Sequence, residues 1–422
     1  MLRTRFISTD PNSSNGTIIL DKNYFYIEAL EDGLNAYLNS NVECTLDGEQ
    51  WQNLSSASQI TLRTGERMYF RGNLIPSSSN GIGSFSLNKK CKVGGNIMSL
   101  LFGSEFENQT NLSSQNYSFY KLFYNCQNLI SAEELLLPAT TLSAYCYSQM
   151  FYECSNLELG PELTALNLAT HCYSYMFYNC NKLSKAPNLP ADYVEPYSYY
   201  YMFYGCNSLN TTPAILAVTL SQYACFRMFS NCNNLYNASN VLSVCSTIGE
   251  YSCQYMFYNC SKLSRCPRKL IPNELASGCY SYMFYGCSSL IYTPQLPAQT
   301  LANNCYSYMF YRCTNITIVP DLPATILADA CYEYMFMYCT KIGVSCTLAA
   351  DILTSNCYSY MFSGCTNLRA ITMLATSIPY SNSLLNWVNS VKSSGTFTKH
   401  LSMTSLPLGN SGIPNGWTIV DY

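Results

Sequence analysis

The stretch CYSYMFYGCSSLIYTPQLP, residues 279–297, decides the fold, because related copies of it fill most of the chain. Its central Met-Phe pair recurs at intervals of 26 to 28 residues. Self-similarity at a fixed period is the sequence signature of a repeat architecture. A degenerate first copy has Leu122 in place of the methionine, and the later copies have Met150, Met176, Met202, Met228, Met256, Met283, Met309, Met335 and Met361.

Positions within each copy are counted from this methionine as position 0. Position +4 is cysteine in all ten copies, position −8 is aliphatic in nine, and position −4 is cysteine in six. Positions −8, −4, 0 and +4 fall on one face of a helix with about 3.6 residues per turn. The spacing therefore predicts a short helix in each copy with a buried stripe of aliphatic, cysteine, methionine and cysteine side chains.

The rest of each copy is typical of extended chain, as in LSKAPNLP and ITIVPDLP. Proline recurs at +11, for example at Pro187, Pro294 and Pro320. Because proline has no N–H for a sheet ladder, we expect a strand of only a few residues ahead of it. One short strand and one short helix in a unit of about 26 residues predict a leucine-rich-repeat solenoid.

The pattern C-Y-x-Y-M-F-Y-x-C-x-x-L-x-x-x-P-x-L-P resembles the BspA-like leucine-rich repeats of bacterial surface antigens, over residues 118–375. The resemblance implies adhesion and recognition, on bacterial surfaces, in some parasites and in phages of gut bacteria. It implies no catalysis. The end of the chain, with Leu384-Leu385-Asn386-Trp387 and Gly412-Ile413-Pro414-Asn415-Gly416-Trp417, is similar to the closing segment of such proteins.

The residues before and after the repeat copies predict an N-terminal β-module and a cap at each end of the solenoid. Residues 1–95 read as a small all-β sandwich or barrel, residues 96–117 as an N-terminal cap or linker, 118–375 as a ten-unit solenoid and 376–422 as a C-terminal cap. Solenoids need such ends because a terminal copy exposes its hydrophobic face. We expect strands, bounded by turn-forming residues, at 25–30, 41–46, 60–64, 67–71 and 83–87.

Composition excludes several classes of function. Among 422 residues, 11% are charged and the formal net charge is −3, which argues against a nucleic-acid partner. No apolar run reaches the ~20 residues of a membrane helix, so we expect no membrane insertion. The first residues, MLRTRFISTDPNSSNG, lack the apolar stretch and cleavage site of a standard export signal.

The 23 cysteines predict a column of buried thiols. Positions −4 and +4 lie about 12 Å apart along a helix, beyond the ~7 Å that a disulfide allows. The sequence has two histidines, His171 and His400, and none of the closely spaced cysteine pairs of zinc sites. Disulfides or metal between neighbouring copies are the alternatives. We expect no metal and no cofactor.

The 38 tyrosines supply the candidate binding residues. Tyrosines at −3 are expected to be half-buried. Tyrosines at +2 lie nearly opposite the buried stripe, which predicts an exposed row of tyrosines along the array. This row is a candidate surface for binding a glycan or a protein. The alternatives are that its rings stack between copies or contact a neighbouring chain. These candidates are Tyr124, Tyr152, Tyr178, Tyr204, Tyr258, Tyr285 and Tyr311.

These observations favour a non-catalytic recognition or structural protein. The first interpretation is a phage virion component, such as a fibre, decoration or receptor-binding protein, assembled in the host cytoplasm. Its partners are a host surface glycan or protein, or other virion proteins, and a homo-oligomer such as a trimer stays open. The alternative is a cell-surface adhesin of a bacterium or parasite. An enzyme is the third, and no GxSxG, P-loop, HExxH or GxGxxG motif supports a catalytic site.

Overall fold

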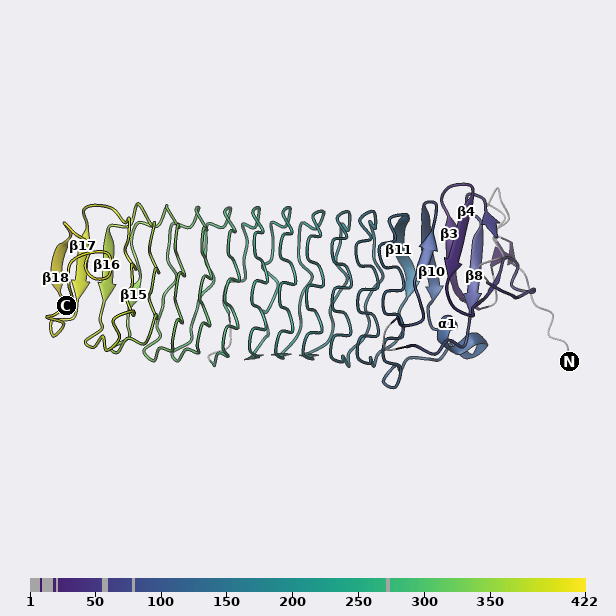
Figure 1. Cartoon of the computed structure of the whole chain (residues 1–422), viewed down its shortest axis with the longest axis horizontal. Coiled ribbons are helices and arrows are strands. Elements are labelled where there is room, and N and C mark those ends of the chain that lie inside the picture. Colours follow the sequence, from purple (N-terminus) through teal and green to yellow (C-terminus); the bar gives the residue numbers. More distant parts are fainter. Residues whose placement is uncertain (1–7, 10–17, 20–21, 55–59, 78–79, 271–273) are drawn as a thin grey trace. The chain divides into compact units, whose positions relative to one another are not determined.

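The computed structural model describes residues 8–9, 18–19, 22–54, 60–77, 80–270 and 274–422. The expectation about an export signal concerns residues 1–16, most of which lie outside the described residues. The chain divides into two compact units, Met1–Ala191 and Asp192–Tyr422. Each unit contains copies of the repeat (Figure 1). No helix among the described residues has the length and apolar character needed to cross a bilayer.

The first unit begins with an all-β module, as predicted. Its main sheet has the strand order β11-β10-β3-β8-β5-β6, a second sheet has the order β7-β4-β9, and β1 (Ser8–Thr9) pairs with β2 (Ile18–Ile19). The other strands of the module are β3 (Phe25–Ala29), β4 (Leu34–Leu38), β5 (Glu43–Thr45), β6 (Gln52–Asn53), β7 (Thr61–Leu62), β8 (Arg67–Arg71), β9 (Phe85–Leu87) and β10 (Cys91–Asn96).

Each of the five predicted ranges contains an observed strand, and β1, β2, β4, β6 and β10 were missed. β4 has the alternation of buried and outward residues that is typical of a strand, since Leu34, Ala36 and Leu38 are buried and the residues between them are not. β10 pairs antiparallel with β3 and parallel with β11 (Leu129–Leu136), a strand of the first repeat copy. The main sheet of the module therefore extends into the repeats (Figure 1). Between β10 and β11 lie α1 (Ser99–Phe102) and η1 (Gly103–Glu105).

The prediction of a short helix in every copy is wrong. Residues −5 to +4 form a run of four-residue turns, called here the turn segment, in which positions −5, −1 and +3 have positive φ. In the quoted copy these are Gly278 at 60°, Tyr282 at 58° and Gly286 at 72°. A repeat of four residues also places −8, −4, 0 and +4 on one side, so the predicted buried stripe is present without a helix.

Hydrogen bonding explains why turns replace the helix. Within the copy, Met283 N–H donates to Tyr280 O at 3.2 Å, the i+3 to i bond of a β-turn. The next N–H, on Phe284, instead donates to Met309 O of the following copy at 2.9 Å. Alternate N–H groups thus bond within the copy and to its neighbour, whereas an α-helix would use them all internally. The lateral bonds offset the ~1–2 kcal/mol cost of a left-handed residue.

Identical side chains stack in columns inside each unit. The methionine at 0, the phenylalanine at +1 and the cysteine at +4 are buried, as Met283, Phe284 and Cys287 illustrate with no exposed surface. Phe284 lies 5.6 Å from Phe257 and from Phe310 between ring centroids, with nearly parallel rings. The tyrosines at −3, expected to be half-buried, are fully buried, because the turn segment directs both −3 and 0 inward.

Strands in the second unit are short and parallel. β12 (Tyr193–Val194), β13 (Thr219–Leu220) and β14 (Thr247–Ile248) form one sheet at positions −9 and −8. The sequence predicts a strand of a few residues ahead of the proline column. At +9 the structure has isolated parallel β-bridges between copies instead, such as Asn237↔Arg265. A leucine-rich-repeat solenoid is therefore the fold class, built from turns and bridges with very little helix.

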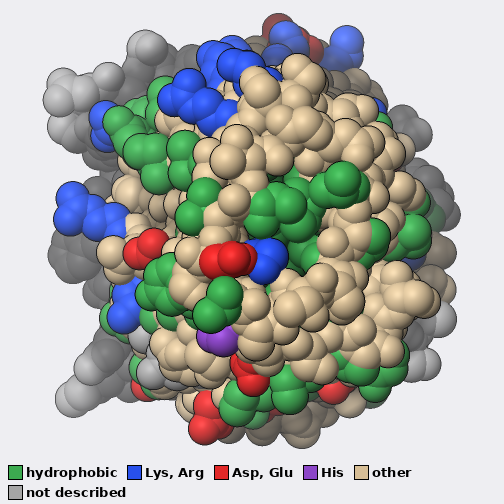
Figure 2. All heavy atoms as spheres, turned by 90° about the vertical axis from the view of Figure 1, so that its left-hand side faces the viewer, with side chains coloured by type: hydrophobic (Ala, Val, Ile, Leu, Met, Phe, Trp, Pro, Cys, Tyr) green, Lys and Arg blue, Asp and Glu red, His purple; other side chains and the backbone are tan. Residues whose placement is uncertain are grey.

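The end of the chain continues the repeat. β15 (Thr347–Leu348), β16 (Ala370–Met373), β17 (Thr396–Lys399) and β18 (Thr418–Asp421) form a parallel sheet. Trp387 occupies the methionine position of one further turn segment, since Phe362 N–H donates to its carbonyl at 2.8 Å and Asn386 and Ser390 have positive φ. Figure 2 shows this end, where hydrophobic side chains lie between tan areas of backbone and other side chains, with Lys, Arg, Asp and Glu side chains scattered among them.

Candidate recognition surface

The predicted tyrosines at +2 form stacked rows on the outside of each unit. In the first unit, Tyr152 lies 4.8 Å from Tyr124 and 4.7 Å from Tyr178, with rings within 3° of parallel. In the second, Tyr285 lies 4.7 Å from Tyr258 and 4.5 Å from Tyr311. Tyr124 is 37% exposed. The other six, including Tyr204, are half-buried rather than fully exposed, because adjacent copies cover the ring faces.

A second row of tyrosines, at position −1, was missed by the sequence analysis. Successive ring centroids in this row are 4.3 to 4.6 Å apart. The signal was the second tyrosine of the C-Y-x-Y-M-F pattern, which a helix would have placed differently from a turn segment. The row in the second unit consists of Tyr255, Tyr282, Tyr308, Tyr334 and Tyr360.

The two rows are neighbours. Tyr282 and Tyr285 have ring centroids 6.0 Å apart, and Tyr308 and Tyr311 5.7 Å. A guanidinium lies against the same surface, since that of Arg227 is 4.1 Å from the centroid of Tyr255. The rows at −1 and +2 together are called here the tyrosine face. It is a rigid amphipathic surface, because stacking fixes each ring and leaves one edge outward.

Burial also sets the charge state of the phenols. It raises the pKa of Tyr152 to about 12, and the nearby carboxylate of Glu153 contributes. Burial raises the pKa of Tyr282 and Tyr308 as well, with neighbouring tyrosines adding to the effect. The hydroxyls of these three tyrosines therefore stay protonated well above neutral pH and can donate hydrogen bonds. Another hydroxyl of the face, that of Tyr204, accepts a hydrogen bond from Asn231 Nδ2 at 2.6 Å.

The cysteines lie where the sequence placed them, as buried thiols. Those at +4 donate S–H to the phenylalanine carbonyl of the preceding copy, as Cys313 does to Phe284 O at 3.0 Å. All but Cys266 and Cys346 are buried, and those two are half-buried. Burial raises the pKa of Cys232 and Cys365 to about 12. Thiols held in this protonated form are weak nucleophiles and weak metal ligands.

The remaining polar candidates do not assemble a reaction centre among the described residues. His171 stacks on Tyr145 at 4.6 Å, and burial lowers its pKa. His400 lies far along the chain, with Nδ1 2.7 Å from Ser402 Oγ. The part of the chain that the structure describes contains no group of three or more histidine, cysteine or acidic residues able to hold a metal ion.

Comparison with known families agrees with this geometry. The family described as BspA type Leucine rich repeat region matches residues 119–264 and 253–384, with six copies. The chain belongs to this family. Leucine-rich-repeat solenoids are typically non-enzymatic binding scaffolds, and their stacked copies create an extended surface for a partner. No curated protein matches the chain in sequence.

Proposed function

We propose that the protein is a non-catalytic recognition protein of a phage virion, acting as a fibre, decoration or receptor-binding component. The observation that carries the recognition role is the tyrosine face. Tyrosine gives large amphipathic contact area at low cost in side-chain entropy, and stacking removes much of the remaining cost before a partner binds. The partner is a glycan or protein of the host surface, or another virion protein.

The thiols support assembly in a cytoplasm. The chain contains 23 cysteines, and those that the structure describes are free thiols, mostly buried. Thiols persist in the reducing cytoplasm, whereas extracellular proteins usually pair them. A virion protein folds in that compartment and leaves it already folded, with its thiols enclosed.

The second candidate is a cell-surface adhesin of a bacterium or parasite, motivated by the resemblance of the repeats to those of bacterial surface antigens. Mass spectrometry of purified phage particles and of washed cell envelopes separates the two. Detection of the protein in particles at a fixed ratio to the capsid protein supports the virion component. Detection in envelopes alone contradicts it and leaves the adhesin.

The tyrosine face is tested by a triple variant with Tyr258, Tyr285 and Tyr311 changed to alanine. Labelled protein is titrated onto host cells, and we expect binding to weaken at least about tenfold while the fold survives, because tyrosines are enriched among the interface residues whose truncation costs most binding energy. The control changes Tyr197, Tyr223 and Tyr251, a row at −5 with centroids 5.0 and 5.1 Å apart. Equal loss in both variants would remove the specific role of the face.

A further inference from the structure

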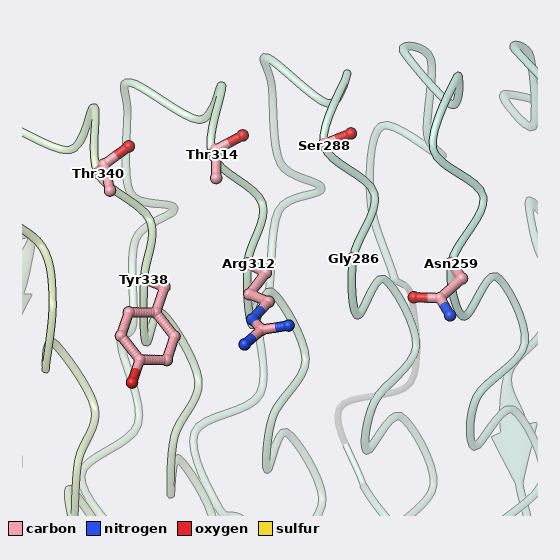
Figure 3. A pocket seen from close by; sticks show the side chains of 7 residues that line it. All are labelled: Asn259, Gly286, Ser288, Arg312, Thr314, Tyr338 and Thr340. Atoms are coloured by element: carbon pink, nitrogen blue, oxygen red, sulfur yellow. The ribbon is translucent and has the colours of Figure 1, made fainter.

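A recess of about 480 Å³ lies on the outer surface of the second unit. Four residues at position +3 of successive copies line it: Asn259, Gly286, Arg312 and Tyr338. Figure 3 shows these in one row, with a second row of hydroxyl-bearing side chains beside it. The hydroxyl row belongs to position +5 of three of the same copies.

The recess exists because Gly286 has no side chain. Position +3 has positive φ in every copy of this stretch, and Asn259, Arg312 and Tyr338 adopt it at 58°, 59° and 64°. The backbone therefore does not require glycine here. A Cβ on Gly286 would lie 2.5 Å from Asn259 Oδ1, the end of a flexible side chain. Glycine opens space that another residue type would fill.

Arg312 gives the recess a positive charge. It is exposed, and its guanidinium lies 5.5 Å from the ring centroid of Tyr311 and 5.7 Å from that of Tyr338. It makes no ion pair with any residue that the structure describes. It is the one cation at this position, where the ten copies have Asn125, Glu153, Asn179, Gly205, Asn231, Asn259, Gly286, Arg312, Tyr338 and Gly364.

The other lining groups suit a polyhydroxylated ligand. Ser288, Thr314 and Thr340 offer hydroxyls from adjacent copies, and Asn259 offers an amide. Hydroxyls and amides both donate and accept, as the hydroxyls of a sugar do. A peptide strand finds no free backbone here, because Gly286 N–H donates to Tyr311 O at 2.8 Å and Arg312 N–H to Met337 O at 2.9 Å.

We propose that this recess binds an acidic oligosaccharide, with Arg312 paired to a sugar carboxylate. A guanidinium matches a carboxylate with two parallel hydrogen bonds. The Tyr338 ring contacts the apolar C–H face of the sugar, and the amide and hydroxyls bind its hydroxyl groups. Neighbouring copies are about 4.8 Å apart, as adjacent strands are, so a linear polymer lying along the recess meets one hydroxyl of position +5 from each of three successive copies. The proposal specifies a ligand class within the proposed recognition function.

The test is calorimetric titration of the whole protein with oligomers of galacturonic, mannuronic and sialic acid. The matched neutral ligand is each oligomer with its carboxyls methyl-esterified. We expect at least one acidic oligomer to bind, and its ester to bind at least about tenfold more weakly, a change of about 1.4 kcal/mol. Arg312→Gln should cause a similar loss, and Gly286→Asn should weaken binding by filling the recess.

The control variant is Arg268→Gln, which removes the same charge from an exposed arginine outside the recess lining. It should change the affinity less than about twofold. The proposal is overturned if none of the three acids binds, if R268Q loses as much as R312Q, or if polyglutamate binds as tightly as the best oligomer. Such a result, with binding to host cells still dependent on the tyrosine face, would leave the proposed function standing.

Discussion

The β-module and the repeats achieve burial by different means. In the module, antiparallel strands bury consecutive residues, as β3 and β8 do, or alternate buried and outward ones, as β4 and β9 do, and charged side chains pair across one sheet. Arg67 Nε lies 2.6 Å from Glu28 Oε2, and Lys92 Nζ lies 3.2 Å from Glu28 Oε1. In the repeats, charges are sparse and the interior consists of columns of identical side chains. Phe310, for example, stacks between Phe284 and Phe336.

The difference shows two sources of specificity. Module strands that are distant in sequence recognise each other through complementary residues, such as opposite charges and interlocking aromatic rings. A repeat copy recognises its neighbour because both have the same residue at the same position. Recognition between copies depends on a regular backbone that aligns identical residues, and it does not depend on pairs of opposite charges. The repeats therefore tolerate a low share of charged residues. Four predictions test this contrast.

The largest expected effect is alkaline unfolding of the repeats. Burial raises the pKa of thiols such as Cys232 to about 12, whereas unfolded thiols titrate near about 8.5. The unfolded chain therefore loses its protons first, and stability falls between about pH 8.5 and pH 12. Each thiol whose pKa is raised in this way adds about 1.4 kcal/mol per pH unit to the loss of stability. All but two of the 23 cysteines, Cys44 and Cys91, lie in the repeats.

The measurement is pulsed alkylation at increasing pH, followed by peptide mass spectrometry. We expect the thiols of the repeats to become labelled together, over a narrow pH range, in step with loss of the circular dichroism signal. Gradual labelling of Cys313 near pH 9 in a chain that is still folded would contradict the buried column.

The next effect is the loss of one ring from a column. Phe310→Ala and Phe70→Ala both remove a ring with no exposed surface, and each should cost about 3–5 kcal/mol. Because a copy contacts only its neighbours, hydrogen exchange in F310A should rise mainly in the adjacent copies. In F70A it should rise across the whole main sheet. If hydrogen exchange rose over an equally large region in both variants, the proposed difference between the module and the repeats would be wrong.

A smaller effect separates two kinds of buried thiol. Cys44→Ser places a hydroxyl in the module core and should cost about 1–3 kcal/mol. Cys313→Ser should cost less, under about 1 kcal/mol, because the Phe284 carbonyl that accepts the S–H bond can also accept the O–H bond. Denaturant unfolding of the two variants gives both values. Equal losses would mean that the S–H bond to the carbonyl has no energetic role.

The smallest effect concerns charge. Glu28→Gln breaks the half-buried pair with Arg67 and should cost about 1–2 kcal/mol, more at low salt than at high salt. Asp421→Asn at the end of the chain removes an exposed partner of Lys399 and should cost less than about 0.5 kcal/mol. Thermal unfolding at two salt concentrations compares them. A salt-independent loss in E28Q would show that the pair contributes packing rather than charge.

Much of the fold followed from the sequence. The positions of the buried stripe, the family and five of the module strands were predicted correctly. The strand β4 was missed although its pattern alternates, and the turn segment around Trp387 was missed because Trp-Val replaces Met-Phe there. The stacked +2 tyrosines were predicted as candidates, whereas the −1 row and the recess at Gly286 depend on how neighbouring copies align.

The sequence by itself determined which residues are equivalent and which of them are apolar, because a period of 26 to 28 residues records both directly. Only the tertiary structure decided the backbone between them. A spacing of four residues fits an α-helix and a run of turns almost equally well. The choice depends on hydrogen bonds to the neighbouring copies, such as Phe284 N–H to Met309 O, which no local pattern encodes. Those bonds turn the −3 tyrosines inward and stack the −1 and +2 tyrosines outside.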